Sequence, residues 1–567
     1  MRPTQRPMLD LTLPTAGPAT NTSLPDIRSA IAWRTWDDGC KEASERRMPM
    51  LVLTEPFWTN TAQRVALQLQ RDPALASVMT EQVIPVLVDP NDRPDLAARW
   101  RRAAVALTGT WGPPLFVFLT HDARPFLTYC TMNVEGDDTY PSLASLVESV
   151  AETYASDAAA FQDDARLLAE NGPPADALAN GDVDALREML DMERGGLNEL
   201  PKHPHPTLLW EMLEAKERDS LPADLEQWLR KTLNALLRGG INDQLDRGFH
   251  RCARDRGWVV PHFEKPVPLN ARLAAVYARA GEMFDEQAYR DIGRQTARFC
   301  EAALRDGVDA LGSDTDYYTW TFKEVRTGIE PSLLQVVTLH YNIQPIDNRQ
   351  ALRQVVAADN LTEYSHEPID VLKSRLVRGR TQLRTIRQRR PVPQAISSGT
   401  LGSQAETLRW LLVASRWIES VDAAAATRTL DALVDGRFVD ERGYVRTDGS
   451  PWLGDQAAIL AAFIEAHRVT NDTQWLHRAR TLGDTLASRW RTPEGWREQP
   501  DADTASGDVI DDILPAALTT LADALHELGE LTRASSFVEL ADETRRIRRT
   551  LAAKCGHWSA ALPIQAD

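Results

Sequence analysis

The feature that most constrains the fold is a helical pattern that recurs from residue 206 almost to the end of the chain. Apolar residues repeat at three- and four-residue spacing, as at Ala457, Leu460, Ala461 and Ile464, which marks one face of a helix. Such segments are readable at about 207–217, 222–238, 268–282, 286–304, 367–385, 403–419, 423–434, 453–470, 473–490, 513–529 and 533–552. Roughly a dozen helices in pairs predict a mainly α (α/α)6 toroid over residues 206–567.

A different pattern precedes the helical part. Short apolar runs at 48–54, 83–89 and 115–119 read as buried strands, and helical stretches separate them. Helix–strand alternation followed by a strand pair and a helix is the thioredoxin order, so residues 26–155 are expected to form an α/β thioredoxin-like domain. Residues 1–25, rich in Pro and Thr, are expected to be a flexible tail, and residues 156–205 a connector.

Composition limits the binding partners and the cellular location that are expected for this chain. The chain has 567 residues, a net charge of −17 and no long basic run, so neither nucleic acid nor an anionic membrane is an expected partner. No window approaches 18 uninterrupted apolar residues, and the first residues lack the apolar core of a secretory signal. The five Cys are scattered, and none forms a Cys-x-x-Cys pair. A cytoplasmic location is expected, and the sequence names no protein partner.

The densest cluster of ionisable side chains, with two His, lies in the stretch 248–265. Gly257 and Pro261 interrupt it, which indicates a hairpin or extended loop. Residues two apart in extended backbone share a face, so His262 and Glu264 are expected to project together. A carboxylate beside an imidazole can raise its basicity. The competing interpretation is a structural loop that ties two helices by ion pairs.

This stretch also carries a family resemblance. Together with Arg238-Gly-Gly-Ile-Asn-Asp243 before it and Asn270-Ala271 after it, it resembles the thioredoxin-domain proteins related to spermatogenesis-associated protein 20. The resemblance covers nearly the whole chain. It implies a thioredoxin-like domain joined to a toroid of the six-hairpin glycosidase type, but it does not define an activity.

The resemblance also locates the positions of a redox motif. Counted back from the loop at Asp89 to Asp95, the two Cys of the family's Cys-x-x-Cys fall on Thr59 and Ala62. Thiol–disulfide exchange needs an attacking thiolate and a resolving thiol, so the thioredoxin-like domain is expected to be redox-inactive. Pro114 stands where a thioredoxin fold places a cis-proline.

The toroid is the second place where chemistry is expected. Related toroids that isomerise or epimerise sugars use paired histidines as acid and base, so by fold analogy His250 and His262 are the catalytic candidates, assisted by Glu264. Trp258 would stack on a sugar ring. The remaining candidates for substrate binding pair charged residues with Trp, as sugar sites do: Arg251, Lys265, Asp314, Asp316, Trp452 and Asp455.

A metal site is considered and not expected. His203 and His205 alternate with prolines, which resembles a metal-ligand spacing, but few acidic ligands stand nearby. No cofactor is expected elsewhere in the chain.

Departures from the family pattern leave two functions open. Pro268-Leu269 replaces Tyr-Asp, and Ile396 to Gly402 replaces the family's Leu-Thr-Ser-Trp-Asn-Gly, so polar residues of the toroid mouth are lost. One hypothesis is an enzyme that binds, isomerises or epimerises a sugar or polyol. The alternative is a non-catalytic binding or chaperone-like protein that descends from the same family.

Overall fold

The computed structural model describes residues 31–552 except 55–59, 109–114, 131–140, 164–182, 313, 397–399, 436, 440–442, 446–450, 494, 501–508 and 510–515. The tail 1–25, Thr59 and Pro114 therefore lie outside the described residues.

The N-terminal domain has the expected thioredoxin-like order. Its elements are α1 (Trp36–Arg46), β1 (Met50–Thr54), α2 (Asn60–Arg71), α3 (Pro73–Gln82), β2 (Ile84–Val88), α4 (Pro94–Thr108), β3 (Leu115–Leu119), β4 (Pro125–Cys130) and α5 (Leu143–Ser156). The sheet order is β2-β1-β3-β4, with β1 parallel to β2 and antiparallel to β3. The parallel pair β1 and β2 is joined by a helical crossover through α2 and α3, as parallel strands require.

Alternation along the strands gives the sheet two buried faces. Met50 and Val52 pack on the side of α1 and α4, whereas Leu51 and Leu53 pack on the side of α2, α3 and α5. Adjacent residues of a strand point to opposite faces, so a continuously apolar strand can serve both sides. Ala62 is buried in α2 against the second of these faces.

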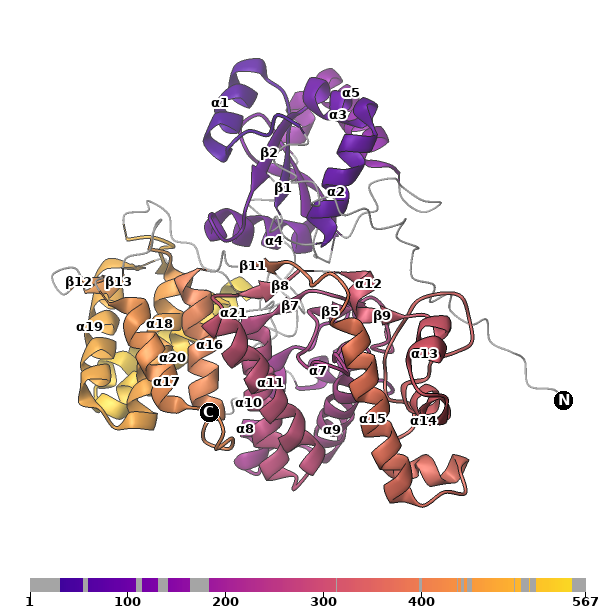
Figure 1. Ribbon diagram of the computed structural model, residues 1–567. Coiled ribbons are helices and arrows are strands. Elements are labelled where there is room, and N and C mark those ends of the chain that lie inside the picture. Colours follow the sequence, from indigo (N-terminus) through magenta and orange to yellow (C-terminus); the bar gives the residue numbers. More distant parts are fainter. Residues whose placement is uncertain are drawn as a thin grey trace.

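Most of the remaining chain forms paired helices in two layers. The inner helices are α8 (Pro206–Glu217), α10 (Val267–Met283), α16 (Leu401–Ala414), α18 (Leu453–Thr470) and α20 (Ala517–Thr532), and each packs on the next. Their outer partners are α9 (Ala223–Arg238), α11 (Gln287–Arg305), α17 (Ala423–Val434), α19 (Thr473–Arg489) and α21 (Ser535–Ala552). The expected fold class, a thioredoxin-like domain followed by a helical toroid, is confirmed, and five helix pairs lie within the described residues (Figure 1).

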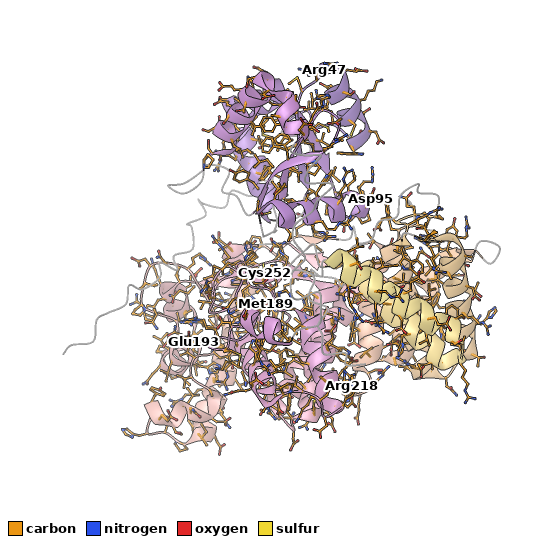
Figure 2. All side chains as sticks on the ribbon, turned by 180° about the vertical axis from the view of Figure 1, so that it is seen from behind. Arg47, Asp95, Met189, Glu193, Arg218 and Cys252 are labelled. Carbon is orange, nitrogen blue, oxygen red and sulfur yellow. The ribbon has the colours of Figure 1, made fainter. Side chains whose placement is uncertain are left out.

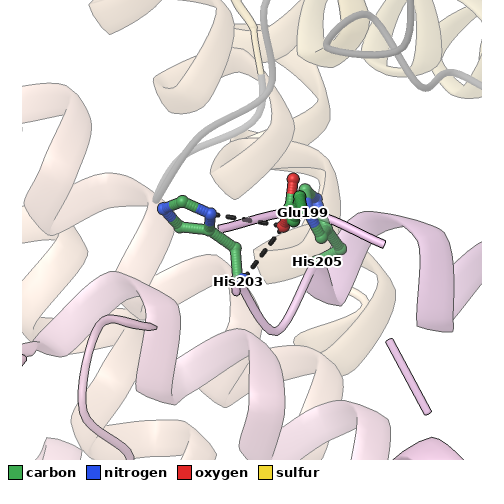
Figure 3. Close-up of side chains that lie close together, drawn as sticks. All are labelled: Glu199, His203 and His205. Carbon is green, nitrogen blue, oxygen red and sulfur yellow. Dashed lines mark hydrogen bonds and ion pairs between the residues drawn. The ribbon is translucent and has the colours of Figure 1, made fainter. Parts of the chain in front are cut away.

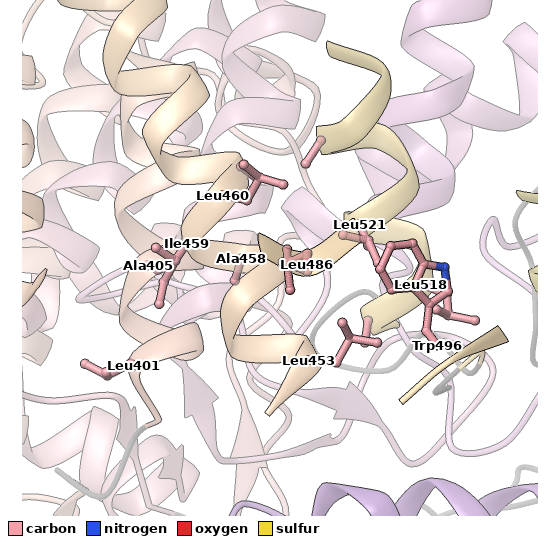
Figure 4. Packing of buried hydrophobic residues seen from close by; sticks show 14 of the residues in the cluster. Leu401, Ala405, Leu453, Ala458, Ile459, Leu460, Leu486, Trp496, Leu518 and Leu521 are labelled. Atoms are coloured by element: carbon pink, nitrogen blue, oxygen red, sulfur yellow. The ribbon is translucent and has the colours of Figure 1, made fainter. Parts of the chain in front are cut away.

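Burial explains which helices are inner. Almost every residue of α10 and α16 and most residues of α18 are buried, whereas α11 and α19 bury one face only. A helix that is apolar on all sides belongs inside, and an amphipathic one on the outside. Figure 4 shows Leu401 of α16, Leu453 and Leu460 of α18 and Leu518 of α20 packed in one cluster.

An insertion between α11 and α16 lies beside the toroid. It contains α12 (Thr315–Tyr318), α13 (Phe322–Gly328), α14 (Pro331–Tyr341), the 3-10 helix η3 (Ala358–Tyr364) and α15 (Ile369–Arg387). Only α15 was expected from the sequence. Helices α12 and α13 and the 3-10 helix η3 are only one or two turns long and carry too few apolar positions to show a period, whereas α14 has 11 residues and was also missed.

Short strands connect the helices of the toroid. They are β5 (Cys252–Ala253), β6 (Pro261–His262), β7 (Lys265–Pro266), β8 (Ala310–Leu311), β9 (Thr319–Trp320), β10 (Gln350–Ala351), β11 (Ala395–Ile396), β12 (Phe438–Val439), β13 (Tyr444–Val445), β14 (Arg491–Thr492) and β15 (Gly495–Trp496). Figure 1 shows β5, β7, β8 and β11 at the end of the toroid that faces the thioredoxin-like domain.

The two domains are joined by apolar contact. One buried cluster runs from Trp100 and Val105 of α4 through Leu115 of β3 to Leu401 and Ala405 of α16. The expected connector is also partly packed: α7 (Val183–Met189) and the residues after it place Leu186, Leu190 and Leu197 in the core of α8 and α9. None of the helices in the described part of the chain combines the length and apolar character that crossing a bilayer requires.

Candidate functional site at the mouth of the toroid

The stretch 248–265 folds as a hairpin, as its turn residues predict. The Asp255 carboxylate accepts hydrogen bonds from the backbone N–H groups of Gly257, at 2.7 Å, and Val260, at 2.7 Å. These bonds turn the chain so that Cys252 of β5 pairs with His262 of β6. An aspartate that binds its own following backbone is a common way to build such a turn.

The charged residues of this stretch are buried in ion pairs. Lys265 bonds the Asp243 carboxylate and donates to the carbonyl of Arg247 at 2.9 Å. Arg387 of α15 binds the same carboxylate through two nitrogens. The two cations hold the pKa of Asp243 well below its usual range, although burial opposes this. Asp243 therefore joins the hairpin to a helix far along the chain.

His250 is held in place by its surroundings. Its Nδ1 is 3.1 Å from the carbonyl oxygen of Phe263, and its ring lies edge-on to the rings of Phe263 and Tyr318. Burial, with a smaller contribution from the charge of Lys265, lowers the pKa of His250 to about 3. The imidazole is therefore neutral at physiological pH.

A small pocket opens beside His250. Its lining residues are Gly240, Asn242, Asp243, Gln244, His250, Phe263, Tyr318, Ala351, Leu352 and Arg387. The rings of Phe263 and Tyr318 are parallel, 5.6 Å apart between centroids. The pocket is narrow, with room for about one water-sized group.

His262 and Glu264 belong to different surroundings from His250. Neither lines the pocket beside His250, so among the described residues that pocket holds only one of the two catalytic histidine candidates. Burial lowers the pKa of His262 to about 4, while the nearby Glu264 carboxylate opposes the shift. Glu264 is fully buried, and its carboxylate lies 3.7 Å from the Arg251 guanidinium.

Three of the expected substrate contacts need correction. Trp258 is 1% exposed, and its Nε1–H donates to the carbonyl of Arg194 at 3.2 Å, so its ring packs in the core and cannot stack on a ligand. Lys265 and Arg251 are also buried, each beside a carboxylate. Their charges therefore stabilise the fold through these ion pairs.

The loop candidates lie at two other places. Asp314 caps α12 by accepting from the N–H of Tyr317, and Asp316 pairs with Arg349 at 3.2 Å. Asp455 accepts from the N–H of Gly402 at 3.1 Å, which caps the neighbouring helix α16. Burial raises the pKa of Asp455 to about 6. Trp452, at the start of α18, is buried.

A second cluster lies close to Cys252. The Glu199 Oε1 atom lies 2.6 Å from His205 Nε2 and 3.3 Å from His203 Nδ1, and it also accepts from the backbone N–H of His203 at 2.9 Å (Figure 3). The His203 imidazole is also within hydrogen-bonding reach of the Cys252 thiol. Seen from behind, Met189, Glu193 and Cys252 lie in the same part of the toroid (Figure 2).

Sequence reasoning missed most residues of the pocket, among them Asn242, Tyr318 and Arg387, and it missed Glu199 of the second cluster. Asn242 and Tyr318 carry no local signal of a site, and Arg387 is 144 residues from its partner Asp243. Glu199 did carry a signal, because Glu-x-x-x-His-x-His spacing sets a carboxylate before two imidazoles.

Known proteins share this architecture in part. A family model, Thioredox_DsbH, described as a protein of unknown function, DUF255, matches residues 23–171. Spermatogenesis-associated protein 20 of Homo sapiens is 23% identical over 529 residues, which cover 80% of this chain and 67% of the human protein. The Mus musculus protein of the same name is 21% identical over 546 residues, which cover 82% and 68%.

The chain is a distant relative of spermatogenesis-associated protein 20. Because the match covers 80% of this chain, it extends beyond the thioredoxin-like domain into the helical toroid.

Two solved structures are also similar. The cellobiose 2-epimerase from Bacillus thermoamylovorans B4167 aligns with a TM-score of 0.40 and 13% identity over 68% of this chain and 86% of that chain. A sugar epimerase from a ruminal bacterium aligns with a TM-score of 0.39 and 10% identity, over 65% and 84%.

Proposed function

We propose that the toroid binds a small hydroxyl-rich ligand, a sugar or a polyol, and that one polar end of this ligand enters the pocket beside His250. One observation carries the proposal. Asn242 Oδ1, Tyr318 Oη and Arg387 Nε are buried, line the same pocket and have no hydrogen-bond partner among the described residues.

Buried polar atoms without partners are costly, at about 1–3 kcal/mol each. A hydroxyl group both donates and accepts, so one inserted hydroxyl can donate to Asn242 Oδ1 and accept from Arg387 Nε. The parallel rings of Phe263 and Tyr318 offer an apolar wall beside these atoms. Aromatic surface next to a few placed polar groups is the usual composition of a site for a small polar ligand.

The charge states favour binding over proton transfer. A general base or acid works best with a pKa near the working pH. His250, with a pKa of about 3, and Asp243, with a pKa well below its usual range, are both far from neutrality. The proposal is therefore a binding function, without His250 and His262 as an acid–base pair.

The test is a melting-temperature screen of the full chain against monosaccharides, disaccharides, sugar phosphates and polyols, with turnover assays on every hit. A ligand present at about 100 times its Kd should stabilise the fold by about 2.7 kcal/mol. Tyr318→Phe removes only the unpaired hydroxyl, so it should weaken the hit while leaving the stability of the free protein nearly unchanged.

Tyr154→Phe is the matched control, because the Tyr154 hydroxyl is bonded to His121 in the thioredoxin-like domain. It should leave ligand binding unchanged. A panel without a hit, or a hit that Tyr318→Phe and Tyr154→Phe weaken equally, would overturn the proposal. Turnover of a hit that His250→Gln abolishes would instead restore a catalytic role.

A further inference from the structure

We propose that Glu199, His203 and His205 form a binding site for a divalent transition-metal ion, with zinc as the first candidate. The site is separate from the pocket beside His250 and does not depend on the ligand proposed for it.

The geometry of the three side chains supports the proposal. Their candidate ligand atoms all lie within 4.8 Å of one another. Metal–ligand bonds of about 2.0–2.2 Å let one ion reach atoms up to about 4 Å apart, so small side-chain movements would complete the coordination. Two imidazoles and one carboxylate are a common ligand set for zinc and for non-haem iron.

A second observation points to a ligand at the same place. The other carboxylate oxygen of Glu199, Oε2, is buried and has no hydrogen-bond partner among the described residues. The Glu199 side chain is only 3% exposed. A buried carboxylate oxygen without a partner is costly, and a cation on this carboxylate would satisfy it.

The backbone holds the three groups ready. Pro204 and Pro206 restrict the chain on both sides of His205, so the two histidines have little freedom to separate. The backbone N–H of His203 donates to Glu199 Oε1, and this hydrogen bond holds the carboxylate against the segment that carries the two histidines. A preformed set of ligands loses less entropy when the metal binds.

The donor set selects the kind of metal. Calcium and magnesium prefer oxygen ligands, and this site offers two nitrogens. The Cys252 thiol beside His203 adds a soft group, which favours zinc or iron further. Three protein ligands would leave one position open to water or to a fourth side chain.

The experiment uses the full-length protein, stripped with a chelator and dialysed. Zinc titration by calorimetry should give one ion per chain, and elemental analysis should find the same ratio after dialysis against metal-free buffer. Glu199→Gln and His205→Gln keep the shape of the side chains and should each weaken zinc binding by more than about a hundredfold.

Two controls separate this site from adventitious binding. His467→Gln removes a histidine at the end of α18, and the double variant Cys555→Ser, His557→Gln removes the Cys and His near the C-terminus. Both should bind zinc as the parent does. Zinc binding that survives Glu199→Gln and His205→Gln, or that the controls abolish, would overturn the proposal.

A spectroscopic measurement on the unaltered chain covers the case in which a variant fails to fold. X-ray absorption at the zinc edge should show scattering from two imidazole rings. A protein that retains no zinc, or a zinc ion without imidazole ligands, would overturn the proposal.

Discussion

Arg387 and Asp243, which are 144 residues apart in the chain, form a buried bidentate ion pair. Arg387 Nη1 lies 2.8 Å from Asp243 Oδ1, and Nη2 lies 3.0 Å from Oδ2. Both side chains are almost wholly buried, and Lys265 binds the same carboxylate. The pair attaches α15 to the segment before the hairpin 248–265, and both residues line the pocket, so the shape of the pocket depends on the pair.

Removing one partner of this pair should destabilise the fold strongly. Arg387→Met leaves Asp243 with Lys265 alone, and breaking a buried ion pair costs about 3–5 kcal/mol. Arg378→Met is the matched control on the same helix, because its partner Glu330 is exposed and such pairs are worth about 1 kcal/mol or less. Urea unfolding followed by circular dichroism measures both, and equal losses would contradict this account.

The buried histidines should make stability depend on pH. Burial lowers the pKa of His250 to about 3, below the value of about 6.5 in an unfolded chain. Between these values the unfolded state binds the extra proton, so stability is full above pH 6.5 and falls as the pH drops towards 3.

The size of this effect can be measured with one substitution. His250→Gln should reduce the slope of unfolding free energy against pH by up to about 1.4 kcal/mol per pH unit within that window. Burial lowers the pKa of His340 to about 4, so the pH range over which this residue affects stability is narrower than for His250. His340→Gln should therefore reduce the slope over that narrower range. Identical slopes in the parent and in both variants would show that these histidines do not titrate on unfolding.

The thioredoxin-like domain should have no disulfide reductase activity. The family resemblance places Thr59 and Ala62 at the positions of the redox cysteines, and burial raises the pKa of Cys40, which disfavours its thiolate. Insulin reduction should proceed at the rate of buffer alone, with a Cys-x-x-Cys thioredoxin as the positive control. Reduction that disappears in Cys40→Ser or Cys130→Ser would contradict this prediction.

Limited proteolysis should separate the two domains. The boundary is expected between residues 150 and 205, and the packing of Leu186, Leu190 and Leu197 against the toroid narrows it to about 157–182. Gly, Pro and Ala concentrate there. A protease of low specificity, with fragments identified by mass spectrometry, should cut there first. A first cut within 222–304 would contradict the domain assignment.

Much of the fold could be read from periodicity. The helices expected at 222–238, 423–434 and 453–470 are observed at Ala223–Arg238, Ala423–Val434 and Leu453–Thr470. Long helices and buried strands repeat their apolar positions many times, so the pattern alone identifies them. The short helices α12 and α13 do not, and sequence reasoning missed them together with α14, the 3-10 helix η3 and the two-residue strands of the toroid.

The candidate sites could be predicted from the sequence far less well than the helices and strands. The order of the residues is enough to show that the hairpin 248–265 gathers histidines and charged residues, and that Thr59 and Ala62 cannot exchange disulfides. Three-dimensional packing was needed to show that Arg387 completes the pocket, that Trp258 is buried, and that Glu199 contacts both His203 and His205. Secondary structure follows from local spacing, whereas a site depends on which side chains long-range packing brings together and on whether burial leaves them a partner.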